Sequence, residues 1–128
     1  MFSHVVVGSN DIDRSRKFYD ALFASLGGKP GQEDDKGRLR YVHRGGLFMV
    51  THPIDGQPAC HANGGTIGFA MESPEEADAW HQAGIANGGT SIEDPPGLRQ
   101  GGFGKLYLAY LRDPDGNKLC AVHRVPAE

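Results

Sequence analysis

The sequence predicts an α+β fold: two tandem βαβββ modules that form a curved, mostly antiparallel sheet with a concave cup. Three observations support this. An apolar strand followed by an amphipathic helix occurs twice, each helix ends at a pair of glycines, and MVTH at 49–52 matches CAVH at 120–123. With 128 residues, the chain has room for one domain over 1–128, with modules at approximately 1–58 and 64–124.

The first module begins with an apolar strand at 4–8. A helix follows, with apolar residues recurring every three or four positions from Ile12 to Leu26, which is typical of one buried face. Gly27 and Gly28 end this helix. Further strands are expected at 29–33, 38–44 and 47–52, and the linker between the modules at 53–64.

The second module repeats this order with a strand at 66–71. Its helix should begin at Ser73, because Pro74 suits a first turn and Glu76 can complete a capping box, and it should end near Gly88 and Gly89. Strands are expected at 90–93, 106–112 and 118–124, with a tight turn at 114–117. Phe69 and Trp80 should pack together between this helix and the sheet.

Composition narrows the possible partners. The net charge is only −3, and the 13 Lys and Arg are scattered, so no nucleic-acid or membrane partner is expected. No segment resembles an export signal or a membrane span, and we predict a cytoplasmic protein. Cys60 and Cys120 are then expected to be free thiols. A small-molecule ligand is the predicted partner.

Strand alternation predicts which residues line the cup. At 66–71 the bulky residues Ile67, Phe69 and Met71 should pack on the helices, whereas Thr66 and the small residues between them should face open space. The same alternation places further residues in the cup: His4, Val6, Gly8, Met49, Thr51, Cys120 and Val122. These small neighbours favour a binding cleft, although a tightly packed sheet centre is the alternative.

The opening strand with His4 and the hairpin YLAYLRDPDGNKLCAVHR together resemble the vicinal oxygen chelate superfamily, which includes glyoxalase I, bleomycin-resistance proteins and extradiol dioxygenases. The resemblance covers essentially the whole chain. It implies a divalent metal held by a His on the first strand of each half and a Glu or His on the last strand of each half. In this sequence those positions hold His4, Met49, Thr66 and Cys120.

Only His4 is a good ligand for a hard divalent metal, because a thioether is soft and a threonine hydroxyl is weak. We therefore predict no metal cofactor, and a native divalent metal stays the alternative, with His43, His52 and His61 as other possible donors. A second alternative is that His4 activates the Cys120 thiol across the cup. A small buried cysteine is the simpler interpretation, and no catalytic residue is assigned.

The glycine-rich segment 94–104 lengthens the second half and has the composition of a mobile cover over a cleft. Arg99 would contact the ligand from it, although a solvated loop is an equal alternative. Tyr107 and Tyr110 lie on opposite faces of the next strand, so one phenol should face the cup and the other should pack beneath a helix. We include Tyr107 with His4, Met49, Thr66, Arg99 and Cys120 as the predicted ligand-binding residues.

Three classes of function remain open. The resemblance and the residues favour a protein that binds a small molecule in its cup, with a degenerate metal site and no assigned activity. The alternatives are a metal-dependent lyase, isomerase or dioxygenase of the same superfamily, and an enzyme that uses Cys120 or a tyrosine without metal. A homodimer is expected, because a curved sheet leaves edge strands that association would cover.

Overall fold

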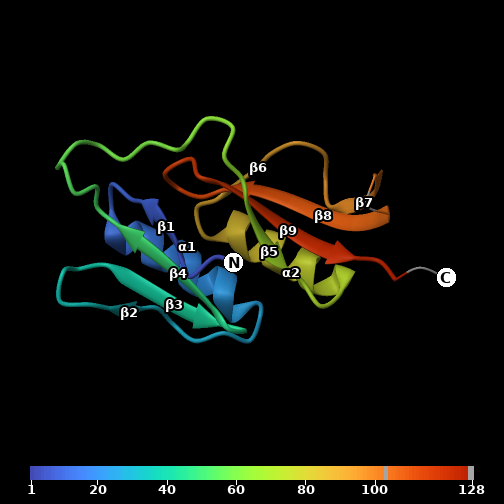
Figure 1. Ribbon diagram of the computed structural model, residues 1–128, viewed down its shortest axis with the longest axis horizontal. Helices are drawn as coiled ribbons and strands as arrows, with labels where there is room; N and C mark the ends of the chain where they lie inside the picture. The colour runs from blue at the N-terminus through green and yellow to red at the C-terminus, as the bar shows by residue number, and fades with distance from the viewer. Residues whose placement is uncertain (103, 127–128) are drawn as a thin grey trace.

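The computed structural model describes residues 1–102 and 104–126, which contain two helices and nine strands. The α+β class and the plan of two modules are confirmed (Figure 1). The first module contains β1 (Val5–Gly8), α1 (Ile12–Ala24), β2 (Gln32–Glu33), β3 (Leu39–His43) and β4 (Gly46–Thr51). The second contains β5 (Ile67–Ala70), α2 (Pro74–Ala86), β6 (Thr90–Ser91), β7 (Gly97–Gly101), β8 (Gly104–Arg112) and β9 (Lys118–Arg124).

Both helices begin at a capping side chain. The Asp11 carboxylate accepts the Arg14 backbone N–H at the start of α1, and the Ser73 hydroxyl accepts the Glu76 N–H at the start of α2. The Glu76 carboxylate in turn accepts the Glu72 N–H at 3.0 Å. None of the helices in the described residues is long and apolar enough to cross a membrane.

The strands of each module form their own hydrogen-bonded sheet, with the orders β1-β4-β3-β2 and β5-β9-β8-β6. In both, the first strand runs parallel to the last, and the other pairs are antiparallel. The added strand β7 pairs with β8, so part of the segment 94–104 that we expected to be a loop is a strand. Phe103, within that segment, lies outside the described residues.

The two helices pack against each other, and each covers one face of its own sheet, so both modules share a single core. In module 1 the core is rich in aromatic rings: Phe18, Tyr19, Phe23, Tyr41 and Phe48. In module 2 Trp80 is fully buried, and its ring centroid lies 6.1 Å from that of Phe69. The predicted packing of these two residues is confirmed.

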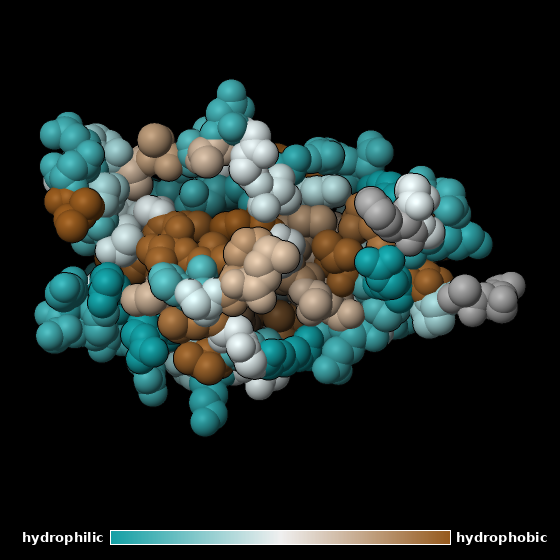
Figure 2. Space-filling model, in the orientation of Figure 1, coloured by the Kyte–Doolittle hydropathy of each residue, from teal (hydrophilic) through white to brown (hydrophobic). Residues whose placement is uncertain are grey.

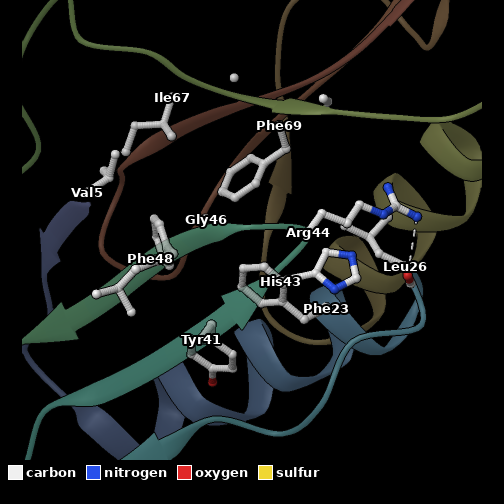
Figure 3. A pocket seen from close by; sticks show the side chains of 13 residues that line it. Val5, Phe23, Leu26, Tyr41, His43, Arg44, Gly46, Phe48, Ile67 and Phe69 are labelled. Atoms are coloured by element: carbon white, nitrogen blue, oxygen red, sulfur yellow. Dashed lines mark hydrogen bonds between the residues drawn. The ribbon is translucent and has the colours of Figure 1, made fainter. Parts of the chain in front are cut away.

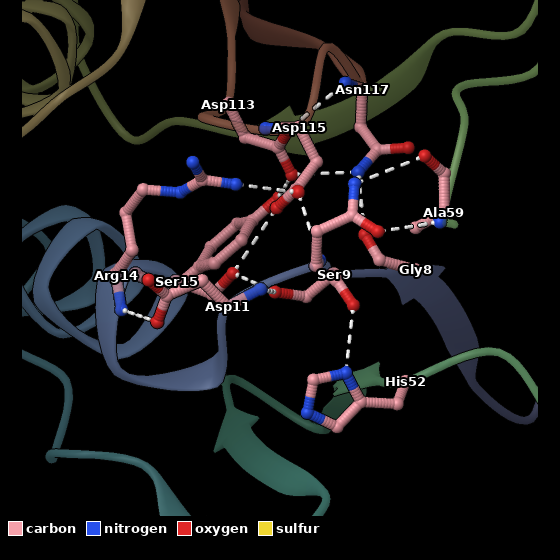
Figure 4. A network of polar contacts seen from close by, with 12 residues as sticks. Gly8, Ser9, Asp11, Arg14, Ser15, His52, Ala59, Asp113, Asp115 and Asn117 are labelled. Carbon is pink, nitrogen blue, oxygen red and sulfur yellow. Dashed lines mark hydrogen bonds and ion pairs between the residues drawn. The ribbon is translucent and has the colours of Figure 1, made fainter. Parts of the chain in front are cut away.

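A polar network fixes the start of α1 against the β8–β9 turn (Figure 4). The Tyr19 hydroxyl donates to the buried Asp113 carboxylate at 2.6 Å, and Arg14 forms an ion pair with Asp115 at 2.8 Å. The Asn117 amide donates both to Asp113 and to the Gly8 carbonyl. The contacts that Tyr19, Arg14 and Gly8 make with this turn join residues about a hundred positions apart and hold the two modules in one arrangement.

Candidate functional site

Each sheet has a face turned away from the helices, which we call the open face. In module 1 Val6 lies opposite Met49 across the β1–β4 pair, and in module 2 Gly68 lies opposite Cys120 across the β5–β9 pair. His4 and Thr66 are each two residues before these positions and lie just outside β1 and β5. Continued strand alternation would carry them onto the same faces, and Thr66 lines one cavity together with Val6.

The four positions differ in exposure. His4 and Thr66 are exposed, and the Ser3 hydroxyl lies 2.7 Å from the His4 Nδ1 atom. The Met49 and Cys120 side chains are buried at the sheet centres. Among the residues that the structure describes, no three His, Cys, Asp or Glu side chains form a group that could hold a metal ion.

Cys120 has a specific environment on the open face of module 2. Tyr110 lies directly opposite it on β8, and the Lys118 ammonium lies 5.1 Å from the Tyr110 ring centroid and forms an ion pair with Glu93. Burial raises the pKa of the Cys120 thiol, more than the Tyr110 hydrogen bond lowers it. A raised pKa favours the neutral thiol, so this environment does not activate Cys120 as a nucleophile.

Of the two tyrosines on β8, Tyr110 is the one on the open face. Tyr107 points toward α2, where its hydroxyl donates to the Asp78 carboxylate at 2.7 Å. Arg99 lies on β7 directly opposite Leu106 of β8. Leu106 is four residues before Tyr110, so Arg99, Leu106 and Tyr110 lie on the same face of the sheet. Its guanidinium donates to the carbonyls of Pro95 and Leu98. The register of β7 and β8 decides which of these side chains lie on the open face, and the sequence alone did not give that register.

Several cavities adjoin the strands, and two of them bear on the function of the protein. A cavity of about 300 Å³ lies where β1 and β5 meet the linker; Val6, Gly8, Cys60, Thr66 and Lys118 contribute to its wall. A second cavity of about 240 Å³ lies where module 1 meets β5, and we call it the seam cavity (Figure 3). None of the six predicted ligand-binding residues lines the seam cavity. Its walls come from both modules, so no local sequence motif indicated it.

A family model described as the glyoxalase/bleomycin resistance protein/dioxygenase superfamily matches residues 1–121. The chain belongs to this superfamily. A glyoxalase/bleomycin resistance protein from Albidiferax ferrireducens T118 is 62% identical, with 97% of this chain and 99% of that chain covered and a TM-score of 0.93. No curated protein matches the chain by sequence.

More distant solved structures share the fold of this superfamily member. The hypothetical protein SA1046 from S. aureus is 19% identical with a TM-score of 0.75, covering 96% of this chain and 93% of its own. The lactoylglutathione lyase from Agrobacterium tumefaciens is also 19% identical, with a TM-score of 0.66 and coverages of 96% and 92%. At this identity the likeness extends to the fold alone.

Proposed function

We propose that this superfamily member binds a small, largely apolar organic molecule at the open faces of its sheets and does so without a resident metal. The observation that supports this most is the identity of the side chains at the four positions where a metal would be held, which are His4, Met49, Thr66 and Cys120. The cavity beside Thr66 supports the proposal, because it offers apolar walls from Val6 and Ile67 and a single nearby cation, Lys118. Concave, mostly apolar sites with few polar groups are typical of small-molecule binding.

The donor set does not fit a hard divalent ion. No carboxylate is present at the four positions to offset the cost of removing water from the metal. Met49 offers a buried thioether, and burial raises the pKa of Cys120, which opposes the thiolate that a metal requires. His4 is then the single strong donor in the set, and one imidazole does not hold a divalent ion tightly.

The exposed apolar side chains support the proposed homodimer. Val6 and Val42 are 45% and 65% exposed on module 1, and apolar side chains gather across the middle of the face shown in Figure 2. A second copy would remove such residues from water. A sedimentation mass near 13.8 kDa at micromolar protein would contradict the dimer.

We also propose a cytoplasmic location, with which the two free thiols agree.

Metal analysis tests the proposed function. The purified protein should carry far less than one transition-metal ion per chain, and zinc, nickel or manganese should barely change its melting temperature. A ligand at about one hundred times its dissociation constant would add about 2.7 kcal/mol. Stoichiometric metal that is lost in His4→Ala would return the chain to the metal-dependent lyases, isomerases or dioxygenases.

A gain-of-function variant provides the control. Met49→Glu combined with Cys120→Glu and Thr66→His would supply carboxylate and imidazole donors on both open faces. This triple variant should bind a divalent metal if the two open faces converge on one site. Failure of a folded triple variant to bind metal would show that the four positions do not share a site.

A further inference from the structure

The seam cavity lies mainly on the helix side of the sheets, and Gly68 and Ala70 of β5 also contribute to its wall. Alternate residues of a strand share a face, and the cavity contains Val5 of β1, Phe48 of β4 and Phe69 of β5, which all face the helices. Phe23 of α1 and Tyr41 of β3 complete its aromatic walls, with Ile67 and Leu26 beside them. Figure 3 shows the rings of Phe23, Phe48 and Phe69 gathered around one space.

The aromatic rings form one connected cluster around this space. The Phe23 ring centroid lies 4.7 Å from that of Tyr41 and 6.0 Å from that of Phe69, while Phe48 lies 5.6 Å from Phe69. Phe69 belongs to module 2 and remains only partly buried. A planar ring that entered the cavity would gain edge and face contacts with several of these rings at once.

One end of the cavity is polar, where His43 and Arg44 lie near Leu26 (Figure 3). The His43 Nε2 atom is buried and has no hydrogen-bond partner among the described residues. The Arg44 guanidinium is already engaged: it donates to both carboxylate oxygens of Glu76 at 2.8 Å each, and it lies 3.5 Å from the Glu72 carboxylate.

The charges at this end select against an anion. The Arg44 charge is matched by Glu76, and Glu72 adds a second negative charge. An anionic ligand would have to compete with Glu76 for a bidentate ion pair and would approach two carboxylates. An uncharged ligand meets no such cost. The His43 Nε2 atom at this end has no hydrogen-bond partner among the described residues and could pair with a polar group of such a ligand.

We propose that the seam cavity is a second binding site, which takes an uncharged aromatic molecule of one or two fused rings. Four aromatic side chains would contact the rings of the ligand, and the end with His43 would accommodate a hydroxyl or carbonyl group. The aromatic walls of this site face the helices, and none of the six residues predicted to bind the ligand lines it, so its test is separate from that of the proposed function.

A matched pair of probes tests the site. The uncharged 2-naphthol should bind at least about tenfold more tightly than the anionic 2-naphthoate at neutral pH, measured by isothermal titration calorimetry. Amide chemical-shift changes should concentrate at the residues of β3, β4 and β5 that line the cavity. Equal affinity for the two probes, or shifts confined to the open faces, would overturn the proposal.

A variant that fills the seam cavity tests whether 2-naphthol binds there. Gly46 shares the face of Phe48, and a Cβ atom added at Gly46 would meet only the His43 carbonyl oxygen, at 3.6 Å, so Gly46→Leu should direct its side chain into the cavity. This variant should lose 2-naphthol binding by at least about tenfold. Gly101→Leu, at an exposed position on β7 with space around it, is the matched control and should bind normally.

A charge variant tests the selectivity. Glu76→Gln removes one carboxylate and loosens the hold on Arg44, so the preference for 2-naphthol over 2-naphthoate should fall to less than about threefold. An unchanged preference would contradict the role of the charges. If Gly46→Leu instead shifts the sedimentation mass and 2-naphthol never binds, a second copy of the chain occupies the cavity and the proposal is wrong.

Discussion

The two modules share one order of elements but fill the space between helix and sheet differently. The helix-facing pair Tyr41–Phe48 of module 1 corresponds to the pair Leu111–Leu119 of module 2. The next pair toward the other end of the strands is Leu39–Val50 in module 1 and Ala109–Ala121 in module 2. Module 1 thus uses the larger side chain at each matched position.

The helices differ in the same direction. Leu22 and Gly84 occupy the same position in their 13-residue helices, and Leu22 is fully buried. A Cβ atom added at Gly84 would lie 2.3 Å from Leu111 Cδ1, so α2 has no room for a side chain there. The absence of a side chain at Gly84 lets α2 lie close to β8 in module 2, whereas the seam cavity lies among the rings of Phe23, Tyr41, Phe48 and Phe69.

The largest expected effect comes from removing an aromatic ring from module 1. Phe48→Ala should lower the free energy of unfolding by about 3–5 kcal/mol, because the change enlarges an existing space. Leu119→Ala, the matched change in module 2, should cost less, since a smaller side chain is deleted. Urea denaturation measures both. A loss under about 1 kcal/mol for Phe48→Ala would show that its ring contributes little to the core.

An added methyl group should destabilise the tight contact between α2 and β8 in module 2. Gly84→Ala should destabilise the fold by about 1–3 kcal/mol, although alanine favours helices, because Leu111 would have to move. Adding Leu111→Val shortens the clashing side chain, so the double variant should be more stable than the sum of the single effects. If the losses of stability in the two single variants simply add in the double variant, the strain does not arise between residue 84 and Leu111.

The network between the modules should show a smaller, pH-dependent effect. Tyr19→Phe removes a hydrogen bond to Asp113 and should cost about 1–3 kcal/mol at neutral pH. Burial raises the pKa of Asp113 above its ordinary 3.8, and losing the tyrosine donor should raise it further. Because a raised pKa favours the folded state at low pH, the cost of Tyr19→Phe should shrink as the pH falls toward 3.8. Thermal unfolding across pH checks this.

The Arg44–Glu76 contact should have the smallest effect on stability. The Arg44 hydrogen bonds hold the pKa of Glu76 below its ordinary 4.5, so the contact stabilises the fold above pH 4.5 and this contribution is lost as the pH falls through the lowered pKa. Glu76→Gln should therefore cost less than about 1 kcal/mol at neutral pH and still less in acid. An equal cost at both pH values would exclude an electrostatic origin.

The local sequence was sufficient to predict most of the elements. Asp11 and Ser73 both act as helix caps, although only Ser73 was predicted, and the alternation around Phe69 assigned the helix-facing side correctly. These features depend on residues a few positions apart, so they can be read along the chain. The short strands β2 and β6 were predicted too long, because their ends depend on pairing with β3 and β8.

By itself, the sequence determined the α+β class and the two modules, because each follows from periodicity and short motifs, and the resemblance of its opening strand and last hairpin indicated the superfamily. Tertiary structure alone decided that Tyr110 and not Tyr107 lies beside Cys120, since strand register sets that face. It alone brought Phe23, Phe48 and Phe69 around one cavity. These residues come from α1, β4 and β5, and only the packing of one module against the other places them together.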